Sequence, residues 1–165
     1  VDNIIEAAKL LLNEKDIHFN LIGTGFEYDA VRKKVDKEEI NNISFQGWLE
    51  YDALPKAISD MDICLGVFGN TLKTDLVIPN KVYHYAACEK IILTKSTMAI
   101  KEVFTDGENI FLINEAPETI ARNILKIKKD YNNYRLIGKK AAKLMRDKYN
   151  PQAIAKIFLS AIGNI

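Results

Sequence analysis

The sequence has little cysteine, no excess of charge of one sign and no long apolar run, and each absence excludes a class of protein. Its 165 residues include two cysteines, Cys64 and Cys88, and both lie in apolar patterns. We interpret them as reduced core residues of a cytosolic protein rather than as a redox pair. The formal net charge of +1 gives no reason to expect a nucleic acid as partner. No run of about 18 apolar residues occurs, so we expect no membrane-spanning helix.

Common catalytic and metal-binding motifs are also missing. The chain has no GxSxG elbow, no HExxH pair and no cluster of cysteine or histidine at metal-ligand spacing. We therefore expect no metal, no cofactor and no complete catalytic apparatus in these residues. The first residues lack an initiator methionine and a signal peptide and start inside a helical pattern, which we interpret as a fragment of a longer chain.

Short apolar runs alternate with helical patterns along the whole chain. The expected strands are 18–22, 43–45, 62–67, 90–93 and 109–113, and the expected helices are 2–14, 26–37, 54–60, 80–88, 99–104, 117–129, 132–148 and 151–162. Because the strands are apolar on both sides, they predict a single α/β domain over residues 1–165, with a parallel sheet and helices on both faces. Ligands bind such sheets beyond the carboxyl ends of the strands. We therefore expect the loops after the first four strands to surround one site.

The strongest functional signal is the segment 66–88, which reads GVFGNTLKTDLVIPNKVYHYAAC. It continues an apolar strand, passes through a polar loop and restarts as a helix near Pro79, Asn80 and Lys81. A helix start presents free backbone N–H groups and the positive end of the helix dipole to an anion. Lys81 adds a full positive charge at the same place. We interpret this segment as a phosphate-binding loop.

Further residues of this loop support the interpretation. Gly66, Gly69 and Lys73 bring small residues and a second cation toward the same helix start. A loop of this length without secondary structure of its own is uncommon unless it is functional. His84 lies three residues past Lys81 and is a candidate donor to a sugar hydroxyl. The alternatives are a surface loop before a helix that begins with proline, and a packed or solvent-facing histidine.

Two other segments give weaker signals. Gly23 and Gly25 follow a strand and precede a helix, which would let a ligand approach the backbone, but Tyr28 stands where the third glycine of a dinucleotide fingerprint would fall. The alternative is a tight turn that needs glycine conformations. The segment 126–148 holds nine lysines or arginines against two aspartates. We interpret it as a solvated helix face, with contact to anionic lipid as the alternative.

The stretch Val67–Tyr83, VFGNTLKTDLVIPNKVY, resembles the carboxy-terminal domain of group 1 glycosyltransferases. Shorter segments similar to that family lie at 21–25, 45–47, 54–55 and 102–107, so the resemblance covers nearly the whole chain. Members of this family have the GT-B architecture, in which two Rossmann-like domains face each other across a cleft. The resemblance implies that residues 1–165 are one Rossmann-like domain that binds a nucleotide-sugar donor. It also implies that an N-terminal acceptor-binding domain is missing from this sequence.

The resemblance assigns roles to particular residues. It places the nucleobase near Gly47 and Trp48, and the diphosphate against Asn80 and Lys81 with Gly23 and Gly25 on the opposite wall. Retaining members of the family carry two glutamates eight positions apart. Leu76 and His84 stand at those positions here. His84 keeps the ability to bond a ribose hydroxyl, whereas Leu76 is unable to hold a sugar hydroxyl.

The implied activity is transfer of a sugar from a nucleoside diphosphate to an acceptor, in polysaccharide or glycoconjugate synthesis. The nucleotide sugar enters as substrate, and the isolated domain is expected to bind it without turnover. The expected location is the cytoplasm, with the full-length protein peripheral at the inner membrane face as a further expectation. The alternatives are half of a nucleotide-sugar epimerase and a non-catalytic nucleotide-sugar-binding module.

Overall fold

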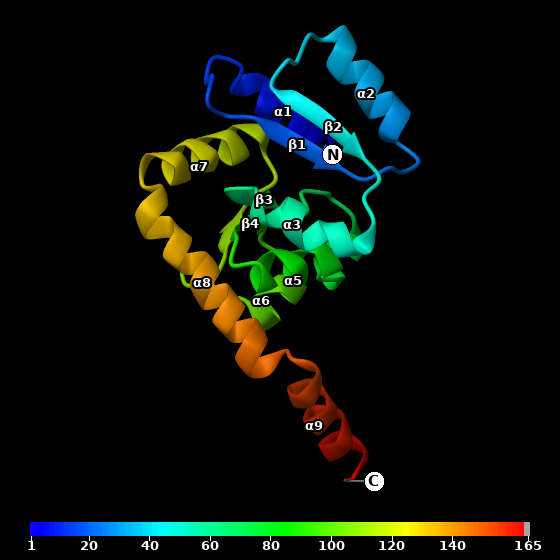
Figure 1. Cartoon of the computed structure of the whole chain (residues 1–165), viewed down its shortest axis with the longest axis vertical. Coiled ribbons are helices and arrows are strands. Elements are labelled where there is room, and N and C mark those ends of the chain that lie inside the picture. Colours follow the sequence, from blue (N-terminus) through cyan, green and yellow to red (C-terminus); the bar gives the residue numbers. More distant parts are fainter. Residues whose placement is uncertain (164–165) are drawn as a thin grey trace.

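A computed structural model describes residues 1–163 of the chain (Figure 1). The strands are β1 (Phe19–Ile22), β2 (Ile43–Gly47), β3 (Ile63–Leu65), β4 (Ile91–Lys95) and β5 (Phe111–Ile113). The helices are α1 (Asp2–Leu10), α2 (Tyr28–Lys37), the 3₁₀ helix η1 (Tyr51–Ala53), α3 (Leu54–Ser59), α4 (Leu72–Leu76), α5 (Asn80–Ala87), α6 (Met98–Val103), α7 (Pro117–Lys129), α8 (Tyr131–Lys148) and α9 (Pro151–Ile162). Each paired strand runs parallel to its neighbour, which confirms the predicted α/β fold.

The strands form two sections instead of one continuous sheet. β1 pairs with β2, while β4 lies between β3 and β5. In the described part of the chain, no hydrogen-bonded pairing joins β1 to β3. The β3–β4 ladder continues beyond β3, because the Gly66 amide donates to the Leu93 carbonyl at 2.9 Å and the Lys95 amide donates to the Val67 carbonyl at 3.0 Å.

Helices cover both faces of the β3–β4–β5 section, as the two-sided apolar strands predict. All five residues of β4 are buried. Ile91 and Leu93 belong to the core cluster that contains Ile5 of α1 and Ile120 of α7. Ile92 belongs to the other cluster, with residues of α5 and α8. Since neighbouring strand residues point to opposite faces, the two clusters lie on opposite sides of the sheet.

One close contact fixes α8 against the turn after α5. A Cβ atom built at Gly138 would lie 2.2 Å from the Glu89 carbonyl oxygen, so only glycine fits there. Glu89 itself adopts the left-handed conformation, with φ of 60°. The backbones of α8 and this turn therefore touch directly, and this contact places α5 against the sheet.

The segment between β3 and α5 differs from the sequence-based expectation. It was expected to have no secondary structure of its own, and that expectation was wrong, because α4 forms inside it. Thr71 is the N-cap residue, and its hydroxyl accepts a hydrogen bond from the Thr74 amide at 3.3 Å. A threonine at this position satisfies one of the free amides of a helix start, which makes so short a helix possible.

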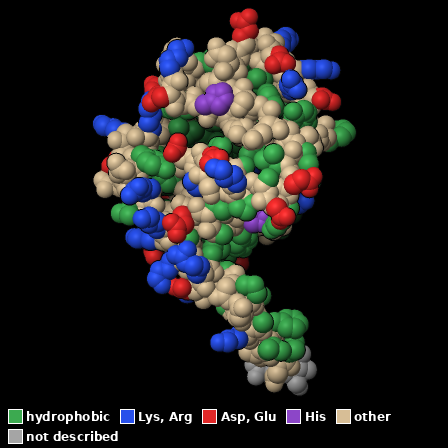
Figure 2. Space-filling model, in the orientation of Figure 1, with side chains coloured by type: hydrophobic (Ala, Val, Ile, Leu, Met, Phe, Trp, Pro, Cys, Tyr) green, Lys and Arg blue, Asp and Glu red, His purple; other side chains and the backbone are tan. Residues whose placement is uncertain are grey.

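The last helix extends away from the body of the molecule (Figure 1). Ile154, Ile157, Phe158, Leu159 and Ile162 of α9 are all exposed, and Figure 2 shows apolar side chains gathered on this extension. Within residues 1–163, no helix has the length and apolar content needed to cross a membrane.

Candidate functional site

A cavity of about 1210 Å³ lies between the two strand sections. Phe19 and Leu21 of β1 line one wall, and Ile63 and Leu65 of β3 line the other. The cavity therefore occupies the place where β1 and β3 would otherwise pair. It reaches the carboxyl ends of both strands, where the fold predicts a ligand.

Three predicted site residues meet in this cavity. Gly23 and Gly25 line it after β1, and Lys81 lines it from α5. These residues come from segments more than 50 positions apart in the sequence. The structure thus brings the glycine turn and the lysine of the α5 start to one site.

The glycine turn leaves open space for a ligand. Gly23 has φ of 113° and Gly47 has φ of 71°, conformations that favour glycine. The Gly23 amide donates to the Gly47 carbonyl at 2.7 Å, which joins the loops after β1 and β2. A Cβ atom built at Gly23, Gly25 or Gly47 would meet no atom within 4 Å. Trp48 follows directly and is 70% exposed, so its ring is accessible beside this open backbone.

Lys81 is a partly buried cation that lacks a charged partner. Burial lowers the pKa of its amine below the ordinary value of 10.5, because the charged form loses hydration. Among residues 1–163, no carboxylate forms an ion pair with it. A desolvated cation of this kind is stabilised by an anion that enters the cavity.

The start of α5 presents free backbone donors beside this cation. Pro79 is the N-cap residue with an extended conformation and makes no side-chain cap. The Val82 amide donates back to the Pro79 carbonyl at 2.9 Å. In the described part of the chain, the amides of Asn80 and Lys81 find no protein acceptor. Asn80 is exposed and Lys81 is partly buried, and unbonded amides at a helix start are suitable donors to an anion.

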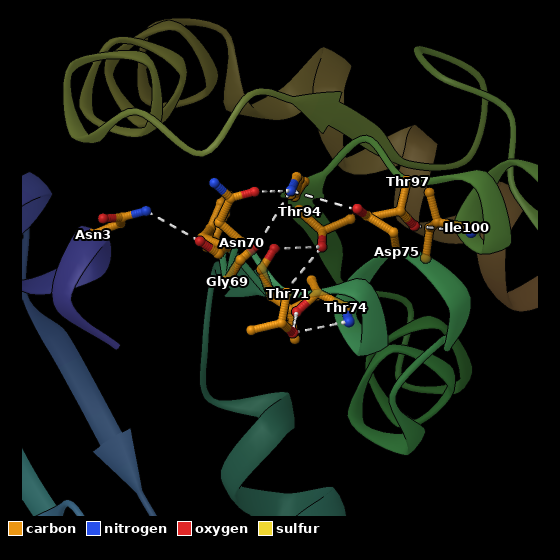
Figure 3. A network of polar contacts seen from close by, with 12 residues as sticks. Asn3, Gly69, Asn70, Thr71, Thr74, Asp75, Thr94, Thr97 and Ile100 are labelled. Carbon is orange, nitrogen blue, oxygen red and sulfur yellow. Dashed lines mark hydrogen bonds and ion pairs between the residues drawn. The ribbon is translucent and has the colours of Figure 1, made fainter.

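A network of polar contacts holds the segment before α5 (Figure 3). The Thr94 hydroxyl accepts from the Val67 amide at 3.1 Å, and the Asn3 side chain donates to the Phe68 carbonyl at 3.1 Å. Gly66 passes so close to β4 that a Cβ atom there would lie 2.3 Å from the Thr94 hydroxyl oxygen. This position therefore requires glycine because β4 approaches it closely.

Sequence reasoning missed Lys95, the last residue of β4. Its residue exposure is 9%, and its ammonium contacts the Gly69 carbonyl at 3.2 Å, the Asn70 side-chain oxygen at 3.4 Å and the Asp75 carboxylate at 3.4 Å. The available signal was a lysine that ends a largely apolar strand on the carboxyl side of the sheet. Gly69, predicted as a phosphate ligand, thus bonds to Lys95 through its carbonyl.

Other predicted residues lie outside the cavity. Lys73 is exposed on α4, and Leu76 at the end of the same helix is 57% exposed. His84 packs edge to face against Tyr51, with ring centroids 5.9 Å apart. These side chains lie around the carboxyl edge of the sheet. Their predicted contacts with phosphate, sugar or ribose stay predictions.

Of the two cysteines, Cys64 of β3 lines this cavity, and Cys88 is the C-cap residue of α5. Both are free, and burial raises the pKa of the Cys64 thiol to about 12. A thiol with so high a pKa carries almost no thiolate at neutral pH and is therefore unreactive. Within residues 1–163, no group of three or more potential metal ligands comes together.

The fold and this site define a Rossmann-like α/β domain with a cation and free helix-start amides at the carboxyl edge of a parallel sheet. The sequence profile of a family described as glycosyl transferase-like matches residues 2–160. The chain therefore belongs to that glycosyltransferase family. It is 30% identical over 156 residues to an uncharacterized glycosyltransferase of Methanocaldococcus jannaschii, an alignment that covers 91% of this chain and 38% of the relative.

Solved structures confirm the architecture. Anabaena HepE in complex with UDP superposes with a TM-score of 0.83 at 15% identity, over 99% of this chain and 45% of HepE. The C-terminal domain of the group 1 glycosyl transferase LpcC from Francisella tularensis gives a TM-score of 0.72 at 20% identity, over 90% of this chain and 78% of that one. The chain thus has the fold of a GT-B C-terminal domain. It spans less than half the length of HepE and of the archaeal relative.

Proposed function

We propose that this domain binds the nucleotide-sugar donor of a glycosyltransferase, which moves a sugar from a nucleoside diphosphate to an acceptor. The observation that carries the proposal is the cavity that Lys81 shares with the Gly23–Gly25 turn, because Lys81 is a partly desolvated cation with no ion pair among residues 1–163. The description of HepE as a complex with UDP supports the same ligand class.

The diphosphate is the group that fits the α5 start. A helix end stabilises an anion by about 0.3–2 kcal/mol, and a charge-assisted bond to a lysine adds about 1.5–3 kcal/mol. Together with several contacts to the base and sugar, these terms support binding in the micromolar to millimolar range. During transfer, the same positive groups would stabilise the negative charge that develops on the departing diphosphate.

The nucleobase is proposed to bind beside Gly47 and Trp48. The open backbone at Gly47 admits a flat ring, and the exposed indole of Trp48 offers a stacking surface. Lys73 at the surface would contribute only a screened attraction to the phosphates. His84 lies on the same edge and is proposed to contact ribose or sugar hydroxyls.

A second candidate is a non-catalytic nucleotide-sugar-binding module. Leu76 carries no hydrogen-bonding group at the position where the family resemblance implies a carboxylate, and this favours the second candidate. The full-length protein and its His84→Glu variant separate the two. Transferase activity of the wild type supports the enzyme, whereas donor binding without turnover in the wild type supports the module, with or without a gain of activity on His84→Glu.

The remaining parts of the proposal concern the whole protein. We propose that an N-terminal acceptor-binding domain completes it, and the exposed apolar face of α9 supports a missing partner surface. We also propose a cytoplasmic enzyme of polysaccharide or glycoconjugate synthesis with peripheral membrane contact. The free cysteines and the exposed lysines of α8, Lys139, Lys140 and Lys143, support these assignments.

Isothermal titration calorimetry on the 165-residue chain tests the donor-binding proposal. UDP, GDP and their glucose or mannose esters are titrated, with inorganic phosphate as the control anion. A dissociation constant in the micromolar to millimolar range for one nucleoside diphosphate, and weaker binding of phosphate, is the expected result. Heat of binding that is equal for phosphate and nucleotides would refute a nucleotide site.

A further inference from the structure

We infer that Lys95 is a positioning residue that holds the segment 69–79 in the geometry that the diphosphate requires. This inference rests on the proposed function and names a determinant of affinity that lies outside the ligand cavity. It concerns the phosphate part of the ligand, and it separates Lys95 from the residues that contact the base.

The geometry of Lys95 is the first support. Its residue exposure is 9%, which is rare for a lysine. Its ammonium lies 3.2 Å from the Gly69 carbonyl, 3.4 Å from the Asn70 side-chain oxygen and 3.4 Å from the Asp75 carboxylate. Figure 3 shows Gly69, Asn70 and Asp75 turned toward one common point, where the dashed lines of these contacts meet.

The identity of the partners is the second support. All three acceptors belong to one stretch of seven residues, 69–75, which connects β3 to the α5 start. The long apolar stem of Lys95 stays in the core while its charged end reaches this connection. The charge therefore ties the loop to the sheet, and its pairing with Asp75 limits the cost of burial.

The path from Lys95 to the phosphate site is short. Asp75 lies five residues before Asn80, so fixing Asp75 against β4 sets where the α5 start can lie. Thr94 next to Lys95 already holds Val67 at the other end of the connection. Without the ammonium, the Gly69 carbonyl and the Asp75 carboxylate would lose their partner, and the connection would sample more conformations.

The nucleobase side of the site is independent of this anchor. Gly47 is the last residue of β2 and Trp48 follows it, and β2 belongs to the other strand section. Loss of the Lys95 contacts should therefore weaken the binding of a nucleoside diphosphate while leaving the binding of the nucleoside unchanged. A merely structural role would weaken both ligands alike, which gives the inference a distinctive readout.

The experiment compares UDP and uridine on five forms of the 165-residue chain by calorimetry. The forms are the wild type, Lys95→Met, Lys95→Arg, Asp75→Asn and the control Lys90→Met. Lys90 directly precedes β4 and donates to the Ser59 carbonyl at 2.7 Å, so its replacement removes a lysine–backbone contact at the other end of this strand. Thermal unfolding is measured for each form.

We expect Lys95→Met to weaken UDP binding about tenfold or more and uridine binding less than about twofold. Asp75→Asn is expected to weaken UDP about threefold by loosening the same connection, and Lys90→Met to leave both ligands within about twofold. Lys95→Arg is expected to restore part of the UDP affinity, because it keeps the charge at the end of β4.

Several results would overturn the inference. One is UDP affinity in Lys95→Met equal to that of the wild type, and another is an equal loss for UDP and uridine. If Lys95→Met does not fold, Asp75→Asn decides, because its carboxylate is partly exposed and unchanged UDP affinity there contradicts the inference. If the wild type binds uridine and UDP equally, or binds neither, the proposed function and this inference are both contradicted. The first two results contradict this inference alone and leave the proposed function standing.

Discussion

Replacing Lys81 by methionine should stabilise the free protein and weaken its ligand binding at the same time. Methionine keeps most of the volume and removes the charge. Lys81 lines the cavity and has no carboxylate partner among residues 1–163, and burial lowers its pKa below 10.5. The charged form is therefore disfavoured by the fold, and its removal relieves this penalty.

The sign of the pH dependence follows from this lowered pKa. Near the lowered pKa the folded protein binds fewer protons at Lys81 than the unfolded chain, so the wild type gains stability as pH rises. The penalty is complete below the folded-state pKa and disappears above the ordinary value of 10.5. Lys81→Met should therefore exceed the wild type in stability most clearly near neutral pH, and the difference should shrink as pH approaches 10.5.

For function, the weaker binding of UDP to Lys81→Met matters more than the gain in stability. One charge-assisted bond to phosphate contributes about 1.5–3 kcal/mol, which corresponds to a factor of about 10 to 150 in the dissociation constant for UDP. Denaturant titration at pH 7 and 10 measures the stability, and calorimetry measures the affinity. Lys129→Met, on the exposed end of α7, is the matched control for the loss of one surface lysine. A Lys81→Met variant that is less stable at pH 7 and binds UDP like the wild type would refute the reasoning.

Further predictions follow from single contacts. Gly138→Ala should lower the free energy of unfolding by about 3 kcal/mol or more in denaturant titration, because the new Cβ lies 2.2 Å from the Glu89 carbonyl oxygen; an unchanged midpoint would contradict that close approach. Trp48→Ala should weaken uridine and UDP by the same factor, since stacking contributes about 1–3 kcal/mol per base, and calorimetry with both ligands checks this. Lys73→Met should change UDP affinity less than about threefold, because an exposed charge is screened. A larger loss of affinity would indicate that Lys73 contacts the ligand directly.

Much of the fold was accessible from local sequence patterns. The strand predicted at 90–93 is β4 (Ile91–Lys95), and the helix predicted to start after Pro79 is α5. An apolar run and a proline that fixes φ are signals carried by neighbouring residues. The first helix was expected to reach residue 14 but ends at Leu10, and the following turn is closed by the Glu14 amide donating to the Leu11 carbonyl. Apolar periodicity alone does not register such a turn.

The candidate site was only partly accessible, because its geometry depends on contacts between distant residues. Lys81 and Gly23 were both selected from their local motifs, and the structure brings them to one cavity. Lys95 was missed because its role appears only when β4 lies beside the segment 69–75, some 20 to 26 positions away. The separation of β1 from β3 also has no local signal, since strand pairing is decided by packing across the whole domain.

The most direct test of the central claim is a nuclear magnetic resonance titration of the labelled 165-residue chain with UDP. If the cavity holds a diphosphate between the α5 start and the glycine turn, the amide signals of Asn80, Lys81, Gly23 and Gly25 should shift together and saturate with one dissociation constant. Signals of α9 should stay in place during the same titration. Unchanged signals at these four amides at millimolar UDP, or shifts confined to another surface, would contradict the account.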